Sequence, residues 1–202
     1  MLCQLSTVKT RLNIDSFNVQ YDELLTNAIN SVSARFDQET NRTLARTVSA
    51  TFEFSANDVE ICPSIYPIES VSKFETKTSE SAGWIEQTGV EYLIRRSCII
   101  SLSANNLGPW TLGFGPGPAL ARITYTGGYV LPGTSPSAGQ TALPSDLEQA
   151  AVEQVACWFQ NREALGLTRL WPHGGTYEQF SGLDLLPSVE AVLHRHQRMA
   201  FA

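Results

Sequence analysis

The sequence predicts an α+β fold: a small antiparallel helical body interrupted by a β-rich insertion. Two observations lead to this expectation. Apolar residues recur at helical spacing over residues 22–42 and again over 146–165. Between these segments the period changes to the alternation typical of strands, broken by turns rich in Gly and Pro. The expected domains are a helical body of residues 1–46 and 143–202, a β insertion of residues 47–130 and a flexible loop of residues 131–142.

The N-terminal region predicts two helices. The stretch STVKTRLNI predicts a short helix with Ser6 as a candidate N-cap. The next helix begins near Asp22 and Glu23 and ends near Arg42, and charges of these signs at these ends suit the helix dipole. One stripe of this long helix is apolar and consists of Leu25, Ala28, Ile29, Val32 and Phe36.

The insertion predicts several strands joined by turns. The stretch TVSATFEF alternates, which places Val48, Ala50, Phe52 and Phe54 on one face of a strand. Further strands are expected in VEIC, IESVSKFET, EYLIRRSCIISL and LARITYT, and turns in SESAGW and NNLGPW. The stretch GFGPGPA predicts a surface loop, because its prolines and glycines exclude regular structure.

The C-terminal region predicts a second long helix and a short terminal one. Pro144, Ser145 and Asp146 form a helix start, and Gly166 is a natural stop. Because each long helix carries an apolar stripe that must be covered, we expect the two stripes to pack together. The expected helical core consists of Leu25, Ile29, Val32 and Phe36 packed against Leu147, Ala151, Val155 and Trp158.

Composition argues against several classes of protein. Hydrophobic residues make up 43% and charged residues 17% of the 202 residues, so a packed core is expected and global disorder is not. The formal net charge of −6 argues against a protein that grips nucleic acid by its phosphates. No apolar run reaches the roughly 20 residues of a membrane helix, and the first residues do not resemble a secretory signal. The four cysteines are widely spaced and are expected to be reduced, buried thiols.

Signals for chemistry are weak, and we expect neither enzyme activity nor a cofactor or metal. His194 and His196 are two residues apart, so on a helix they would point about 200° apart and could not share a metal ion. The loop GFGPGPA lacks the Lys-Ser/Thr pair of a phosphate-binding loop. No GxSxG, HExxH or Cys/His catalytic motif is present. The tryptophans of turns and loops, Trp84, Trp110 and Trp171, fit local packing better than contact with a partner.

One ordered set of motifs spans nearly the whole chain. It comprises VKTRL before the first long helix, YTGGY at the end of the last strand, LPSDLEQA at the start of the second long helix, NRE near its end and LLPSVEAVL near the C-terminus. In this order the set resembles the head–tail connector (adaptor, or head-completion) proteins of long-tailed bacteriophages. The insertion resembles the longer, β-containing branch of that family. The chain departs from the family pattern in LHRHQRMAFA, where a histidine pair replaces a tyrosine-and-arginine ending.

The resemblance implies a structural role in a virion. Proteins of this family form a ring, twelvefold by this resemblance, under the portal of the filled head, extend the DNA channel and give the tail a docking surface. The implied partners are further copies of the chain, the portal protein and a tail-side protein such as a stopper or tail terminator, with no membrane. Genome DNA would pass through the channel without specific binding, which an acidic chain suits. The implied location is the virion neck, after assembly in the host cytoplasm.

The residues alone leave alternatives open. A carbohydrate- or ligand-binding β module, or a small enzyme, on a helical base would make the insertion the working part. A DNA-binding adaptor is a third alternative, which the net charge disfavours. We expect the C-terminal segment to dock on the portal rather than to pack on its own body, because a short amphipathic helix gains stability from a groove on a partner. The expected docking residues are Val189, Val192, Leu193, Arg195 and Arg198.

Overall fold

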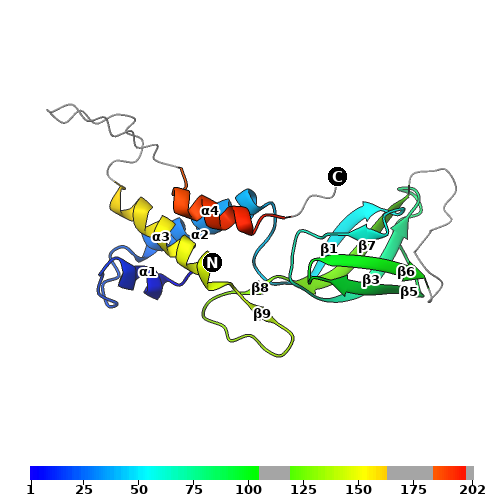
Figure 1. Ribbon diagram of the computed structural model, residues 1–202, viewed down its shortest axis with the longest axis horizontal. Helices are drawn as coiled ribbons and strands as arrows, with labels where there is room; N and C mark the ends of the chain where they lie inside the picture. The colour runs from blue at the N-terminus through cyan, green and yellow to red at the C-terminus, as the bar shows by residue number, and fades with distance from the viewer. Residues whose placement is uncertain (105–118, 163–183, 199–202) are drawn as a thin grey trace. The chain divides into compact units, whose positions relative to one another are not determined.

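The computed structural model describes residues 1–104, 119–162 and 184–198 (Figure 1). The expected turn NNLGPW, the helix stop at Gly166 and most of the loop GFGPGPA lie outside these residues, as do Trp110, Trp171 and His173. The chain divides into two compact units. The helical unit comprises Met1–Asn41, Leu131–Ser135 and Ala142–Gln197, and the β unit comprises Arg42–Val130, Pro136–Thr141 and the stretch that begins at Arg198.

Helices α1 (Leu5–Arg11) and α2 (Asp22–Thr40) open the helical unit. The apolar stripe of α2 is fully buried at Leu25, Ile29, Val32 and Phe36. The helix ends at Asn41, whose left-handed backbone conformation (φ 50°) closes the last turn. The N-cap of α1 differs from the prediction: Gln4, two residues before Ser6, occupies the cap position, and no side chain caps the helix.

Helix α3 (Ser145–Gln160) packs against α1 and α2. Leu147, Ala151 and Val155 are buried, whereas Trp158 is only half-buried, and its indole N–H is buried without a hydrogen-bond partner among the described residues. The stripe that faces inward is therefore broader than predicted, and it includes the side chains of Val152 and Gln154.

Helix α4 (Pro187–Arg195) packs on α2 and α3 within the helical unit (Figure 1). The fully buried Gln154 holds the chain that leads into it: its amide nitrogen donates to the Asp184 carbonyl (3.3 Å), and its amide oxygen accepts from the Leu186 backbone N–H (2.9 Å). These two hydrogen bonds fix the backbone before α4, because breaking either one would leave a buried polar group without a partner and cost its full desolvation free energy.

The β unit is built from two antiparallel sheets around one core. The four-stranded sheet has the order β1-β7-β3-β4 and the three-stranded sheet the order β2-β6-β5, and β8 and β9 pair in a small sheet of their own. Phe54, Phe74, Ile100, Ile123 and Tyr125 lie in the shared core. The strands are β1 (Thr47–Ser55), β2 (Glu60–Ile61), β3 (Ile68–Lys77), β4 (Ile85–Glu86), β5 (Val90–Arg95), β6 (Ile99–Ala104), β7 (Leu120–Gly127), β8 (Tyr129–Val130) and β9 (Thr141–Ala142).

Two predictions about the strands need correction. The even alternation expected for β1 breaks at Ser49, which has a positive φ (55°) inside a register shift, and Val48 is consequently 61% exposed while Phe54 is buried. The stretch EYLIRRSCIISL forms a hairpin instead of one strand, because Arg96 and Ser97 both adopt positive φ and turn β5 back into β6.

The stretch YTGGY marks a crossing where three segments of the β unit come close. A Cβ atom on Gly127 would lie 2.8 Å from the Pro67 carbonyl oxygen, and one on Gly128 would lie 2.6 Å from the Ala45 carbonyl oxygen. Gly128 also has φ +98°. Glycine is therefore required at both positions, since any larger residue would push these backbones apart.

The fold is mixed α+β, with four helices and antiparallel sheets in the described part of the chain. The finer expectation, a body dominated by two long helices, understates the β part, which contributes nine strands among the same residues. None of the described helices combines the length and apolarity that a membrane span requires.

Candidate functional site

The expected docking face on α4 is not free. Val189 and Leu193 are buried and Val192 is half-buried, because the apolar side of α4 completes the core with α2 and α3. The expectation that this apolar face docks on the portal is therefore corrected, because the face already packs within the helical unit. Arg195 remains exposed on the outer side of α4.

Arg198 is also committed within its own unit. Its guanidinium donates to the Cys62 carbonyl and lies 5.5 Å from the centre of the Phe52 ring. The two arginines that were expected to act together therefore differ, and only Arg195 presents its charge at the surface.

The two histidines near the end of α4 have different surroundings. His196 Nε2 lies 3.0 Å from Asp146 Oδ2 at the start of α3, and His194 is exposed. Burial tends to raise the pKa of Asp146, but the hydrogen bond and charge of His196 outweigh it and lower that pKa below its usual value. Within the described ranges no cluster of three or more His, Cys, Asp or Glu side chains could hold a metal ion.

A buried arginine anchors the start of the β unit. The side chain of Arg42 is only 4% exposed, and its guanidinium stacks 3.3 Å from the centre of the Tyr66 ring and 5.2 Å from that of Tyr129. It donates to the Tyr66 carbonyl, while its Nε has no hydrogen-bond partner in the described structure. Two aromatic faces thus stabilise this buried cation by cation–π contact.

Two buried cysteines lie near Arg42. Cys62 and Cys98 are buried in one small cluster. Burial, followed by the nearby Cys98, raises the pKa of the Cys62 thiol, and the opposing effects of Arg198 and Arg42 do not cancel the rise. Since the reactive form of cysteine is the thiolate, Cys62 is a structural thiol at neutral pH.

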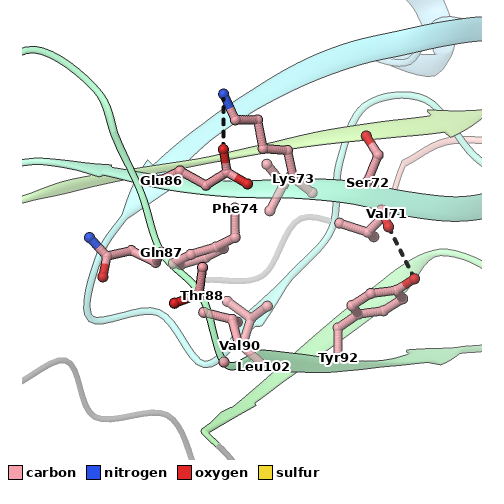
Figure 2. Close-up of a pocket in the computed structure, with 12 residues that line it drawn as sticks. Val71, Ser72, Lys73, Phe74, Glu86, Gln87, Thr88, Val90, Tyr92 and Leu102 are labelled. Atoms are coloured by element: carbon pink, nitrogen blue, oxygen red, sulfur yellow. Dashed lines mark hydrogen bonds and ion pairs between the residues drawn. The ribbon is translucent and has the colours of Figure 1, made fainter.

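Figure 2 shows a cavity in the described part of the β unit that was not predicted from the sequence. Its volume is about 280 Å³, and residues far apart in the chain line it. Lys73 and Glu86 are paired on one side and Tyr92 stands on the other, with Phe74, Val90 and Leu102 forming an apolar floor between them. We call this the β-unit cavity.

The polar groups at the rim of the β-unit cavity are already engaged. The Lys73 ammonium lies 2.9 Å from Glu75 Oε1, and this hydrogen bond raises the pKa of Lys73. The Tyr92 hydroxyl donates to the Val71 carbonyl (3.1 Å). With these polar groups engaged at the rim, the apolar floor of Phe74, Val90 and Leu102 is the part of the cavity open to a binding group.

Comparison with known proteins gives structural likeness only. No known protein family and no curated protein matches the chain by sequence. The fold is similar to that of a chain in the neck of an empty gene transfer agent (GTA) particle computed with C6 symmetry, with a TM-score of 0.58 and 15% identity over 100% of this chain and 92% of that one.

Two further solved structures give the same result. The virion of a native gene transfer agent particle contains a chain with the same TM-score, identity and coverage. The neck of a native GTA particle computed with C12 symmetry contains one with a TM-score of 0.54 and 16% identity, over 100% of this chain and 91% of that one. At these identities the likeness establishes the fold of the chain.

Proposed function

We propose that this protein is a structural subunit of the neck of a phage or phage-like particle, a head–tail connector that works as a ring. One observation carries the proposal: over its whole length the fold is similar to that of chains in two particle necks, whose structures were computed with sixfold and twelvefold symmetry. Because the match covers both units, the neck chains share the pairing of a helical unit with a β unit, and not a single common motif. The role proposed is non-catalytic, in the virion, after assembly in the host cytoplasm.

In this proposal the ring sits between the portal protein and a tail-side protein, and the genome passes through it. The formal charge of −6 per subunit supports the passage of DNA without adhesion, because like charges disfavour lasting contact with phosphates. The helical unit would form the body of the ring with the β unit as its insertion. The exposed Arg195 on α4 is the remaining candidate for charge contact with the portal.

The test is co-assembly with portal rings. The purified chain, mixed with the portal protein of the same particle, should give stacked rings with twelvefold or sixfold averages by electron microscopy. A chain that neither joins the portal nor forms a ring would refute the connector role. Arg195→Glu should weaken co-sedimentation, and its matched control, His194→Glu on the same helix, should weaken it less.

A DNA-binding adaptor would behave differently in a salt titration. Binding that depends on phosphate contacts weakens by orders of magnitude between about 50 and 200 mM salt. Tight DNA binding with this steep slope would favour the adaptor over the connector. The small-ligand alternative gains little from the β-unit cavity, since 280 Å³ lies below the roughly 300–1,000 Å³ typical of ligand pockets.

A further inference from the structure

The loop between α1 and α2 presents apolar side chains to solvent. Phe17 is 90% exposed and Val19 is 72% exposed. A single exposed apolar residue is ordinary on a protein surface. Two exposed apolar side chains within three positions of one short loop form a small patch of the kind found at binding surfaces. We call residues 15–20 the knob.

A buried lysine holds the knob in place. The ammonium of Lys9, on α1, donates to the carbonyls of Ser16 (3.3 Å) and Asn18 (2.9 Å) and forms an ion pair with Asp22 (2.5 Å) at the start of α2. Two of the three donors of this ammonium thus bond to carbonyls of the knob, and its charge is balanced by that of Asp22. The side chain of Lys9 therefore links the knob to α1 and to the start of α2, which holds the loop in a defined conformation.

Side chains within the knob add local turns. The Asp15 carboxylate accepts from the Phe17 backbone N–H (2.9 Å), and the Asn18 side chain accepts from the Gln20 backbone N–H (3.0 Å). Such turns fix the backbone on either side of Phe17. A rigid loop loses little conformational entropy when it binds, so its exposed ring can serve as an anchor.

The β-unit cavity has the complementary form. Its floor is apolar, Lys73 and Tyr92 at its rim are engaged within the chain, and its volume of about 280 Å³ is that of one or two side chains. Thr88 is an exposed residue of its lining, and in Figure 2 it lies near Gln87 and Val90, across the cavity from Tyr92.

We propose that the knob of one copy of this chain inserts Phe17 into the β-unit cavity of the next copy. A protruding apolar group and a separate pocket on the same molecule make a head-to-tail contact, which closes into a ring when the rotation between copies allows. The contact rests on the proposed ring, which the symmetric necks of the structural relatives support. The remaining interface would supply the area that a single anchor cannot.

The test uses two cysteine variants and keeps Phe17 intact. Ser16→Cys places a thiol beside the anchor, and Thr88→Cys places one at the lip of the cavity. Under mild oxidation a mixture of the two variants, one of them mass-tagged, should give mixed disulfide dimers, because a disulfide requires Cβ atoms about 4 Å apart. Adding Phe17→Ser to the first variant should abolish them, and adding Val48→Ser, at an exposed apolar site outside both surfaces, should not.

Sedimentation of the oxidant-free chain provides the second measurement. Phe17→Ser and the lip-blocking Thr88→Trp should each weaken self-association by about 30-fold or more, as loss of an interface anchor does. Cross-links only between identical variants, or self-association indifferent to Phe17→Ser, would overturn the inference. The inference would also be overturned if the chain showed neither self-association nor cross-links at any concentration, even if it bound the portal through other contacts. Conversely, a head-to-tail contact through Phe17 without portal co-assembly would support the contact and refute the connector role.

Discussion

The two units of this chain reach their cores by different routes. In α2, four residues at helical spacing are all fully buried: Leu25, Ile29, Val32 and Phe36. In β1 the same kind of periodic pattern misleads, because Phe54 is buried and Val48, six residues earlier on the expected face, lies mostly in solvent. A helix fixes its own period through local hydrogen bonds, whereas a strand follows its partners and changes face wherever the pairing slips.

The units also differ in how they accommodate buried polar groups. The helical unit uses them to hold backbone: Gln154 fixes the approach to α4, and Lys9 supports the knob. The β unit uses paired charges on its strands, where Glu75 lies between Arg122 (2.7 Å) and Lys73 (2.9 Å). Steric changes should therefore disrupt the helical unit most, and acid should disrupt the β unit most.

The largest expected effect is in the helical core. Phe36→Ala should lower the free energy of unfolding by about 3–5 kcal/mol, because it removes a large, fully buried side chain and leaves a cavity in the core. Trp158→Ala is the matched change on α3 and should cost less, because that ring is only half-buried. Urea unfolding followed by circular dichroism measures both, and a larger loss for Trp158 would contradict this assignment of the core.

The sequence predicts the helical unit well for a local reason. The inward positions of α2, and Leu147, Ala151 and Val155 of α3, follow from spacing alone, whereas the half-buried Trp158 and the buried Val152 and Gln154 do not. In the β unit, neither Ser49 nor the pair Arg96 and Ser97 is a residue type that signals positive φ, so the bulge and the hairpin could not be anticipated. The cavity and the Lys9 network join residues that only the folded chain brings together.

The second effect tests the crossing at YTGGY in the β unit. Gly128→Ala should cost roughly 2–4 kcal/mol, because the methyl group would meet the Ala45 carbonyl in a backbone conformation that also disfavours a side chain. Gly139→Ala is the matched control: it too has positive φ (+85°), but open space surrounds the position. The control should lose only about 1 kcal/mol by thermal or urea unfolding. Equal losses would mean that backbone conformation alone, and not the close approach, requires glycine at 128.

The third effect is the acid sensitivity of the β unit. Hydrogen bonds from Lys73 and Arg122 lower the pKa of Glu75 against the opposing effect of burial. A depressed folded pKa stabilises the fold above the unfolded value of about 4.3 and loses that contribution as pH falls through the folded value. Glu75→Gln should therefore cost about 1.5–3 kcal/mol near neutral pH, the range for hydrogen bonds to charged groups, and the loss should shrink below about pH 4.

Exposed Glu91 on β5 provides the control for that titration. Glu91→Gln removes the same charge from the same unit without breaking a described hydrogen bond, and it should change stability by no more than about 0.5 kcal/mol. If the two variants followed the same curve from pH 7 to pH 3, the acid response of the β unit would reflect net charge and not the Glu75 contacts.

The smallest effect concerns the pair that joins the start of α3 to the end of α4. Asp146 and His196 are both partly exposed, so their ion pair should contribute no more than about 1 kcal/mol. Because the pKa of Asp146 is lowered in the folded protein, the ion pair stabilises the fold at pH values above the unfolded pKa of about 3.9. This stabilisation should disappear as the pH falls through the lower folded pKa. Asp146→Asn should thus weaken the fold slightly at pH 5 and not at pH 2–3, and 0.5 M salt should reduce the difference. His196→Gln should reproduce the loss at pH 5, whereas His194→Gln, at an exposed position on the same helix, should not. If all three variants unfolded together at every pH, α4 would be held by Val189 and Leu193 alone, and its charged end would remain entirely available to a partner.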